Sequence, residues 1–364
     1  MHFSLSEQQI EMQDAVRRFL AAEAPIRRVH AVFDGDDGYD ATIWRGLSEL
    51  GVLGIALPIE HDGMGLELLD LALVSEAVGE AAAPGPFLNH VIAALAIAWA
   101  GDDAQRAKWL PRLASGELTA TIAFAEAGAA WQPHEWTLSG TDTLNGQKHF
   151  VPYASKAELV VVGLQNGGFA VVERADALPE CKPINGVDRT RRTDTVTFRN
   201  TPATLLSNSS LQVAGRVRDA ALVLLAADSF GGASRSVQMA VDYANTREQF
   251  GVKIGLFQGL KYQIVNTAVE VEPARGLYWY AAHAFTHMPS ESERMAALAK
   301  SHLTSVYLQA TRTMVESHGG IGFTWEFDAH IYLKRAMFNY AFMGAAEVHQ
   351  QRAIELAGWA HAAT

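Results

Sequence analysis

The period of the hydrophobic pattern changes twice along this 364-residue chain, and this constrains the fold more than any single motif does. Residues 1–118 and 211–364 carry apolar side chains at helical spacing, for example at Met12, Val16 and Leu20. Residues 119–210 carry short apolar runs instead, and some of these alternate at the period of a half-buried strand. The pattern predicts a mainly α protein with an antiparallel β domain in its middle and helical domains at both ends.

Capping and turn residues help to locate the individual helices and strands within these zones. Ser6 with Gln9 has the spacing of a capping box, and so does Ser290 with Glu293. In the middle zone, the turn at 165–168 lies between two apolar runs and predicts a hairpin. The predicted strands are residues 119–125, 159–162, 169–172 and 195–198. The predicted helices include residues 71–83, 91–100, 217–245, 290–319 and 345–360.

Composition excludes several classes of protein. The net charge of -11 argues against a nucleic-acid binder, which usually has a basic excess. A single cysteine, Cys181, excludes an intrachain disulfide framework and a cysteine-ligated zinc site. The longest apolar runs, such as residues 91–100, are too short for a membrane span, and no signal peptide is visible. We therefore expect a cytoplasmic protein with a large core.

Six segments, in order along the chain, carry a family resemblance. They are residues 3–8 (FSLSEQ), 50–54 (LGVLG), 63–65 (GMG), 145–148 (NGQK), 246–258 (TREQFG, then IG and FQ) and 318–323 (HGGIGF). With these segments, nearly the whole chain resembles the acyl-CoA dehydrogenase family. The resemblance implies a C-terminal four-helix bundle and a tetramer that binds FAD partly across a dimer interface. It also implies α,β-dehydrogenation of an acyl-CoA thioester, with electrons passing to an electron-transferring flavoprotein.

The resemblance places contacts to the FAD tail of a neighbouring subunit at seven positions: Arg247, Gln249, Phe250, Phe257, Gln258, Gly319 and Gly320. The arginine offers a planar fork of donors that suits a pyrophosphate, and the glycines let a ligand approach the backbone. Simpler alternatives are an ion pair between Arg247 and Glu248 and an ordinary helix stop at the glycines. Glu316 departs from the family pattern, which commonly has glutamine there.

The flavin-ring side departs further from the family pattern. Residues 123–130 (AFAEAGAA) keep Glu126 and Gly128 but lack the hydroxyl groups that the family uses to hold the ring. Phe150 keeps an aromatic wall, whereas Pro152 has neither a hydroxyl nor a backbone N–H. We therefore predict that this chain's own β domain binds flavin poorly or not at all.

The catalytic base is also missing at both positions that the resemblance suggests. Met343 occupies the usual position and Ala221 the alternative one, and neither side chain can accept a proton. Asp228 lies two helical turns after Ala221 and remains the candidate carboxylate, with a buried or ion-paired acid as the alternative. Glu347 is expected to be a solvated acid in the first turn of the last helix.

Other chemistry-bearing residues give weaker signals. His283 and His287 share a helical face, but no third ligand is indicated, so we expect a surface pair and no metal site. Cys181 has no candidate base partner. The arginines of residues 189–192 would suit a phosphate, although we expect a solvated turn there.

The chain keeps tail contacts and loses the ring site and the base, which suggests half of an enzyme. It resembles the non-catalytic-type subunit of heterotetrameric (α2β2) acyl-CoA dehydrogenases, which often act on steroid-derived CoA thioesters. The segments APGPF at 83–87 and FTWE at 323–326 carry this narrower resemblance. The expected partners are a homologous catalytic subunit, an acyl-CoA substrate and an electron-transferring flavoprotein. Two alternatives stay open: an independent flavoprotein with monooxygenase-like chemistry, and a non-enzymatic scaffold.

Overall fold

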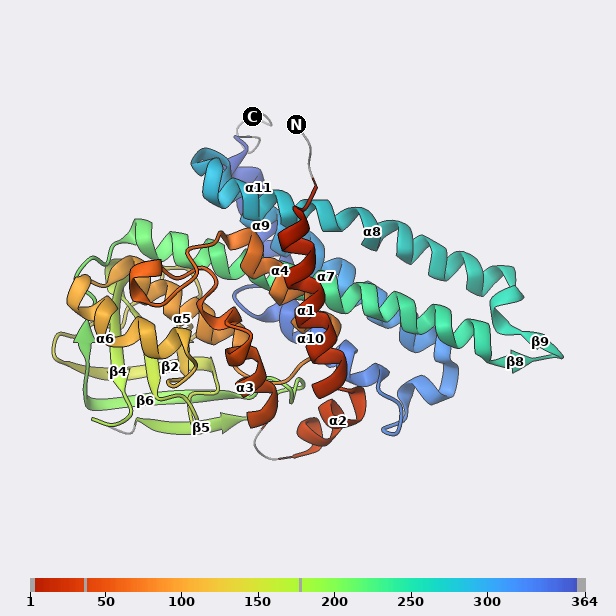
Figure 1. The fold of residues 1–364 in the computed structure, drawn as a ribbon, viewed down its shortest axis with the longest axis horizontal. Coiled ribbons are helices and arrows are strands. Elements are labelled where there is room, and N and C mark those ends of the chain that lie inside the picture. Colours follow the sequence, from red (N-terminus) through yellow and green to blue (C-terminus); the bar gives the residue numbers. More distant parts are fainter. Residues whose placement is uncertain (1–3, 36–37, 177–178, 359–364) are drawn as a thin grey trace. The chain divides into compact units, whose positions relative to one another are not determined.

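The computed structural model describes residues 4–35, 38–176 and 179–358 (Figure 1). The chain packs as two compact units, each assembled from separate segments. The bundle unit holds Met1–Asp34, Ala72–Ala83 and Val223–Thr364, and the sheet unit holds Gly35–Leu71 and Pro84–Leu222. Two helices contribute to both units: α4 (Leu68–Glu80) and the 36-residue α7 (Leu211–Thr246).

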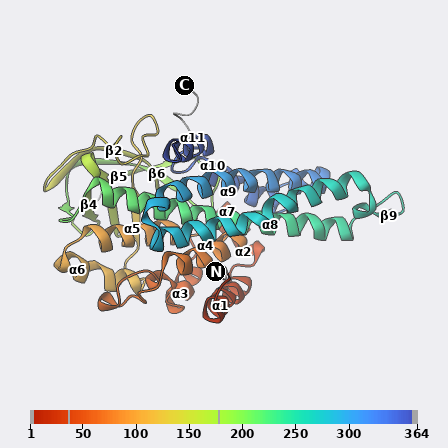
Figure 2. The same cartoon turned by 90° about the horizontal axis from the view of Figure 1, so that it is seen from above.

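The bundle unit is built from long helices. Besides its parts of α4 and α7 it contains α1 (Glu7–Glu23), α2 (Ile26–Asp34), α8 (Gln258–His287), α9 (Pro289–His318), α10 (Ala329–Ala341) and α11 (Ala346–Leu356). The short strands β8 (Glu248–Gln249) and β9 (Val252–Lys253) form a hairpin between α7 and α8. Helices α8 and α9 pack side by side, and Figures 1 and 2 both place the hairpin at one tip of this bundle.

The sheet unit combines short helices with two sheets. Its helices are α3 (Ala41–Glu49), α5 (Phe87–Ala100) and α6 (Asp103–Ala114). One sheet has the order β1-β3-β4-β7, from Ala120–Ala123, Leu159–Leu164, Gly168–Glu173 and Thr204–Leu205. The other has the order β2-β6-β5, from Thr143–Pro152, Thr193–Pro202 and Glu180–Ile184. Alternating apolar side chains from both sheets, such as Val160, Val162 and Val196, share one core.

The predicted fold class is confirmed: helical segments precede and follow a middle β region. The predicted hairpin is confirmed as β3 and β4 joined through Gln165–Gly167. The sheets are not entirely antiparallel, however, because β1 pairs with β3 in parallel register, Ala120 opposite Leu159. The chain leaves β1 and returns to β3 only after β2, and a long connection of this kind permits parallel pairing.

The capping predictions had different outcomes. The Ser6–Gln9 box is confirmed, since the side chain of each residue bonds the backbone N–H of the other. The Ser290–Glu293 box is wrong, because α9 begins one residue earlier at Pro289, whose fixed φ suits the first helical position. Glu293 instead accepts the Nε–H of Arg352 at 3.1 Å.

The predicted helix ends differ modestly from the structure. Helix α7 begins at Leu211, six residues before the predicted start. Helix α11 ends at Leu356, and the predicted end at Ala360 lies outside the described residues. Within residues 4–35, 38–176 and 179–358, no helix combines the length and apolar character that a membrane crossing needs.

Helices α4 and α7 cross at two glycines within the bundle unit. A Cβ atom added to Gly79 would lie 2.0 Å from the backbone oxygen of Asp228, and one added to Gly231 would lie 2.0 Å from that of Glu76. Real Cβ atoms do not come this close to backbone atoms, so the helices reach this separation only because both residues are glycine. The close crossing therefore sets the backbone of Glu76 against Gly231 and the backbone of Asp228 against Gly79.

Candidate functional site

The residues predicted to contact a cofactor tail lie where α7, α8 and α9 meet the β8–β9 hairpin. Arg247 directly follows α7, and its carbonyl oxygen accepts the N–H of Ile254 at 2.9 Å, which closes the base of the hairpin. Tyr243 of α7 stacks on His318 at the end of α9, with ring centroids 4.2 Å apart. The structure therefore brings residues that are more than 60 positions apart in sequence to one end of the bundle unit.

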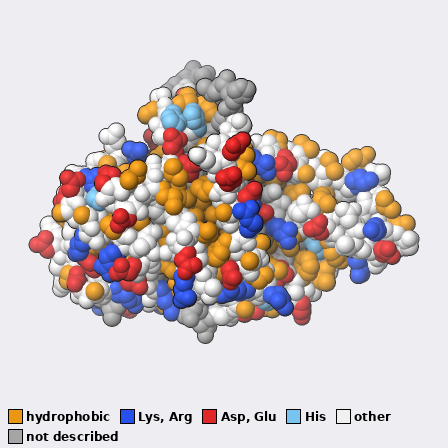
Figure 3. Space-filling view, viewed as in Figure 1, with side chains coloured by type: hydrophobic (Ala, Val, Ile, Leu, Met, Phe, Trp, Pro, Cys, Tyr) orange, Lys and Arg blue, Asp and Glu red, His pale blue; other side chains and the backbone are white. Residues whose placement is uncertain are grey.

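The guanidinium of Arg247 is available to a ligand. No hydrogen bond or ion pair from any described residue reaches it, so the alternative ion pair with Glu248 does not form. Phe250 is 91% exposed at the hairpin tip and meets Phe257 edge-on, with ring centroids 6.1 Å apart. Figure 3 shows hydrophobic and basic side chains close together on the surface at this end.

The glycines at the end of α9 leave room beside these groups. Gly319 has φ +62, and a Cβ atom added to either Gly319 or Gly320 would meet no heavy atom within 4 Å. Open space, aromatic faces and a guanidinium fork together fit a dinucleotide tail with its phosphates. Glu316 accepts the Nε2–H of Gln263 at 2.6 Å, which gives the unexpected carboxylate a partner within the chain.

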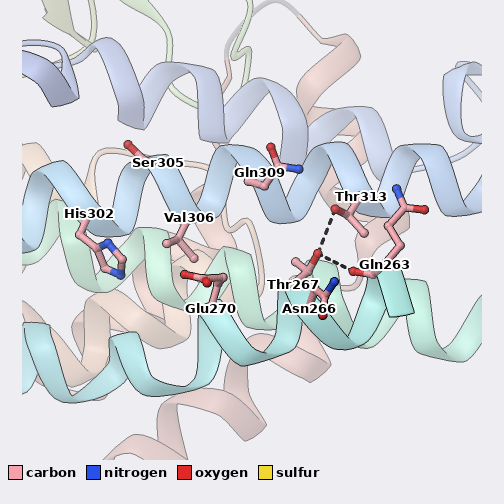
Figure 4. A pocket seen from close by; sticks show the side chains of 9 residues that line it. All are labelled: Gln263, Asn266, Thr267, Glu270, His302, Ser305, Val306, Gln309 and Thr313. Carbon is pink, nitrogen blue, oxygen red and sulfur yellow. Dashed lines mark hydrogen bonds between the residues drawn. The ribbon is translucent and has the colours of Figure 1, made fainter. Parts of the chain in front are cut away.

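A polar groove begins beside this Gln263–Glu316 contact and runs between α8 and α9 (Figure 4). Its volume is about 530 Å³. Thr267 and Thr313 are hydrogen-bonded across it at 3.0 Å, whereas Glu270 and His302 face the groove without a hydrogen bond to any described residue. The lining residues are Gln263, Asn266, Thr267, Glu270, His302, Ser305, Val306, Gln309 and Thr313.

The sheet unit uses Glu126 as an internal anchor. Its carboxylate accepts a hydrogen bond from the ammonium of the fully buried Lys148 at 2.7 Å. It also accepts hydrogen bonds from the backbone N–H groups of Thr137 and Leu138 at 2.9 Å each. These donors lower the pKa of Glu126 to about 2 despite its burial. Burial in turn lowers the pKa of Lys148 to about 8, against the opposing effect of Glu126. A carboxylate with this many internal partners fastens the loop before β2.

The remaining ring-side side chains pack within the chain or lack hydrogen-bond donors. Phe150 sits on a register shift of β2 with φ +53, and its ring stacks on Trp131 with centroids 6.1 Å apart. The hydroxyl of Tyr153 accepts the N–H of Gly85 at 3.0 Å and donates to the carbonyl of Gly38 at 2.7 Å. A flavin ring needs donors for its nitrogen and carbonyl oxygen atoms, and the side chains of residues 123–130 and Pro152 offer none.

The loop that carries Met343 is buried and fixed. Met343 is 1% exposed with φ +61, and its carbonyl oxygen contacts Nε2 of His349 at 2.9 Å. Lys300 of α9 donates to the carbonyl oxygens of Tyr340 at 2.8 Å and Gly344 at 2.6 Å, one on either side of Met343. Burial lowers the pKa of Lys300 to about 7, and Glu347 opposes that shift. The loop at the predicted base position is therefore buried and held by Lys300 and His349, and the side chain of Met343 itself cannot accept a proton.

Asp228 has a partner that the sequence did not reveal. Its carboxylate is buried and accepts Nε–H of Arg335 at 3.2 Å and the amide of Asn339 at 2.7 Å, both from α10. Arg335 also donates to the carbonyl oxygen of Ala83 at 3.1 Å. Asp228 is therefore a structural acid, because its hydrogen bonds join α7 to α10. Ala221, on the same helix, is buried as a small core residue.

The weaker candidates have ordinary environments. The rings of His283 and His287 lie 4.6 Å apart, and no metal-binding group of three acidic, histidine or cysteine residues occurs in the part of the chain that the structure describes. Burial raises the pKa of Cys181 to about 11, which disfavours the reactive thiolate. The predicted solvated turn at residues 189–192 is wrong, because Arg191 is buried against Asp188 at 3.0 Å.

Sequence and structure comparisons place these features in a known group. Two family models match: the acyl-CoA dehydrogenase N-terminal domain over residues 6–117 and the C-terminal domain over residues 220–356. Acyl-CoA dehydrogenase IpdE2 of Mycobacterium tuberculosis is 31% identical over 332 residues, which is 91% of each chain. A variant of the Tcur3481-Tcur3483 steroid ACAD is 28% identical with a TM-score of 0.89, over 99% of this chain and 100% of that one. The ChsE4-ChsE5 complex from Mycobacterium tuberculosis, at 23% identity, has the same fold with a TM-score of 0.87 over 97% of each chain.

Proposed function

Because the chain belongs to the acyl-CoA dehydrogenase family, we propose that it is one subunit of an FAD-dependent enzyme and that it supplies half of a cofactor site to a homologous partner. The supplied half is the tail cluster of Arg247, Gln249, Phe250, Phe257, Gln258, Gly319 and Gly320. FAD would provide the hydride acceptor when bound. This chain's residues would only bind and orient its tail.

One observation carries the proposal: Arg247 is exposed without a partner in the described chain, at the same end of the bundle unit as the open Gly319 and Gly320. An arginine held this way has its donors free for a phosphate, and burying them against one would stabilise the ligand through charge-assisted hydrogen bonds. Gln249 and Gln258, both exposed, add amide donors to the tail cluster. The exposed rings of Phe250 and Phe257 offer apolar faces for the adenine.

The partner is proposed because the other half of the site does not fit. Met343 and Ala221 cannot take a proton, Asp228 is committed to Arg335, and the ring-side residues lack side-chain donors. A homologous chain with its own carboxylate and ring site would complete the enzyme. The described surface of α8 also suits a subunit interface, since Tyr262, Val265 and Val269 form an exposed apolar stripe beside the polar groove.

The substrate class is inferred from relatives. The Tcur3481-Tcur3483 protein is a steroid ACAD, and this chain matches the whole length of one of its chains. We therefore propose a steroid-derived CoA thioester as the substrate of the assembled enzyme. By the same family resemblance, we propose an electron-transferring flavoprotein as the electron acceptor.

The test is flavin content with and without a partner. The chain purified alone should show no stoichiometric flavin in its visible spectrum, whereas co-expression with a homologous chain should give about one flavin per pair. Stoichiometric flavin on the lone chain would instead support the independent flavoprotein. A stable complex without flavin would support the scaffold.

A variant within the complex tests the tail cluster directly. Arg247→Ala should lower FAD retention on gel filtration at least about tenfold, because it removes charge-assisted phosphate contacts. Arg18→Ala is the matched control, since Arg18 is an exposed arginine of α1 without a partner among the described residues. Equal FAD retention in both variants would refute the role of Arg247.

A further inference from the structure

The bundle unit contains a second cavity, at the end of α1, that the proposed function does not use. Its volume is about 330 Å³, and it is enclosed by α1, α2, α4, α7 and α10. The buried floor is apolar and consists of Leu20, Ala24 and Ala77. Arg17, Arg235 and Tyr332 supply its polar wall. We call this cavity the Arg235 pocket.

The two arginines of the pocket differ in what they bind. Each nitrogen of the Arg17 guanidinium already has a partner within the chain, because it donates to Glu80 at 2.9 Å, to Glu76 at 2.8 Å and to Gln13 at 3.0 Å. Arg235 is exposed and lies against the hydroxyl of Tyr332. No carboxylate among the described residues pairs with Arg235, so most of its donors remain available at the mouth of the pocket.

The tyrosine is fixed and offers no further donor. Its hydroxyl donates to the carbonyl oxygen of Glu80 at 2.9 Å, at the end of α4. Burial raises the pKa of Tyr332 to about 12, and the nearby Arg235 opposes that rise. Among the described residues, a ligand in the pocket therefore meets the unpaired cation of Arg235 at the rim, the neutral hydroxyl of Tyr332 and an aliphatic floor.

We propose that the Arg235 pocket binds a monocarboxylate with a short aliphatic body. The carboxylate would take the planar fork of Arg235 in bidentate geometry, and the aliphatic part would cover Leu20, Ala24 and Ala77. The volume lies at the lower end of the range for small-molecule sites, which excludes large ligands.

The charges of the pocket select against a dianion. Glu80 lies on the same rim. Its side chain is 40% exposed, although one of its oxygens pairs with Arg17. A phosphate monoester would bring a second negative charge toward that carboxylate, whereas a monocarboxylate can be neutralised by Arg235 alone. A neutral amide of the same length would keep the aliphatic contacts and lose the charge-assisted bonds.

Titration calorimetry on the full-length chain tests the proposal, with hexanoate as the ligand and hexanamide as its neutral counterpart. Hexanoate should bind saturably and at least about tenfold more tightly than hexanamide. Arg235→Gln should weaken hexanoate binding about tenfold and leave hexanamide unchanged. Arg18→Gln, an exposed arginine of α1 outside the pocket, should change neither.

A second variant separates binding in the pocket from attraction to any surface cation. Ala21 is exposed on the rim within α1, so Ala21→Phe should fill the mouth without disturbing the core, and hexanoate binding should be lost. Absence of saturable hexanoate binding to the unmodified chain, or equal affinity in Arg235→Gln, would overturn the proposal. The tail cluster is not involved, so either result leaves the flavin experiments unaffected.

Discussion

The two ends of the predicted active site differ in how their polar groups are used. At the tail cluster, the side-chain donors of Arg247 and of the exposed glutamines have no partner among the described residues, and Phe250 extends into solvent. At the predicted base position and ring side, Asp228, Glu126 and Lys300 are buried and already bonded within the chain. Polar groups left unpaired at a surface are suited to a partner, whereas buried saturated groups stabilise the fold. The contrast supports a chain that binds a cofactor tail for another subunit.

The largest expected effect comes from breaking the buried pair of Asp228 and Arg335. Arg335→Ala leaves an uncompensated carboxylate in the core, so the free energy of unfolding should fall by about 3–5 kcal/mol in urea titration. Arg247→Ala should change it by less than about 0.5 kcal/mol, because that side chain has no partner among the described residues. A similar loss in both variants would remove the contrast between the two regions.

A double substitution tests whether the uncompensated carboxylate causes this loss of stability. Asp228→Leu combined with Arg335→Met removes both charges and keeps much of the volume. We expect the double variant to be less destabilised than Arg335→Ala alone, as measured by the urea midpoint. A loss equal to the sum of the two single-variant losses would mean that the two side chains do not interact energetically, which would contradict the role assigned to the orphaned charge.

The next effect concerns Lys300 and pH. Its pKa is lowered to about 7 in the folded chain from the ordinary 10.5, so between these values the unfolded chain binds more protons. The free energy of unfolding should therefore rise with pH in that window, by about 2 kcal/mol between pH 7 and pH 9 for this group. Lys300→Met should remove that part of the slope, and an unchanged slope would contradict the assignment.

The smallest effect is expected at Asn89 of α5, in the sheet unit. It is 1% exposed, and neither atom of its amide has a hydrogen-bond partner among the described residues. Because an unpaired buried amide is costly, Asn89→Leu should be neutral or stabilise the chain by up to about 1 kcal/mol. Asn89→Asp is the control and should destabilise it clearly. Destabilisation by the leucine would indicate a bound water or ligand at the amide.

Sequence periodicity was sufficient for the helical and β zones, because helix and strand periods depend on neighbouring residues. It could not reveal the parallel pairing of β1 with β3, which depends on where a distant strand returns. The predicted Ser290–Glu293 capping box does not form, because the helix already begins at Pro289. The roles of Asp228 and Lys300 were also hidden, since Arg335 and the carbonyl of Gly344 lie 107 and 44 positions away in sequence.

The tail cluster could be proposed from motifs, but its assembly could not. Nothing in the local pattern says that Tyr243 stacks on His318 or that Gln263 holds Glu316. These contacts join helix ends that are far apart in sequence, and only the packing of α7, α8 and α9 brings them together. The polar groove between α8 and α9 was missed for the same reason.

The crossing of α4 and α7 has a consequence for mutational scanning. Gly79 and Gly231 each face a backbone oxygen that an added methyl group would approach to 2.0 Å. We expect saturation mutagenesis at these two positions to return no tolerated substitution, not even alanine. Gly276 of α8, where a Cβ atom would meet nothing within 4 Å, should accept alanine and many larger residues. In a library of variants, glycines within helices would thus fall into two classes with opposite tolerance.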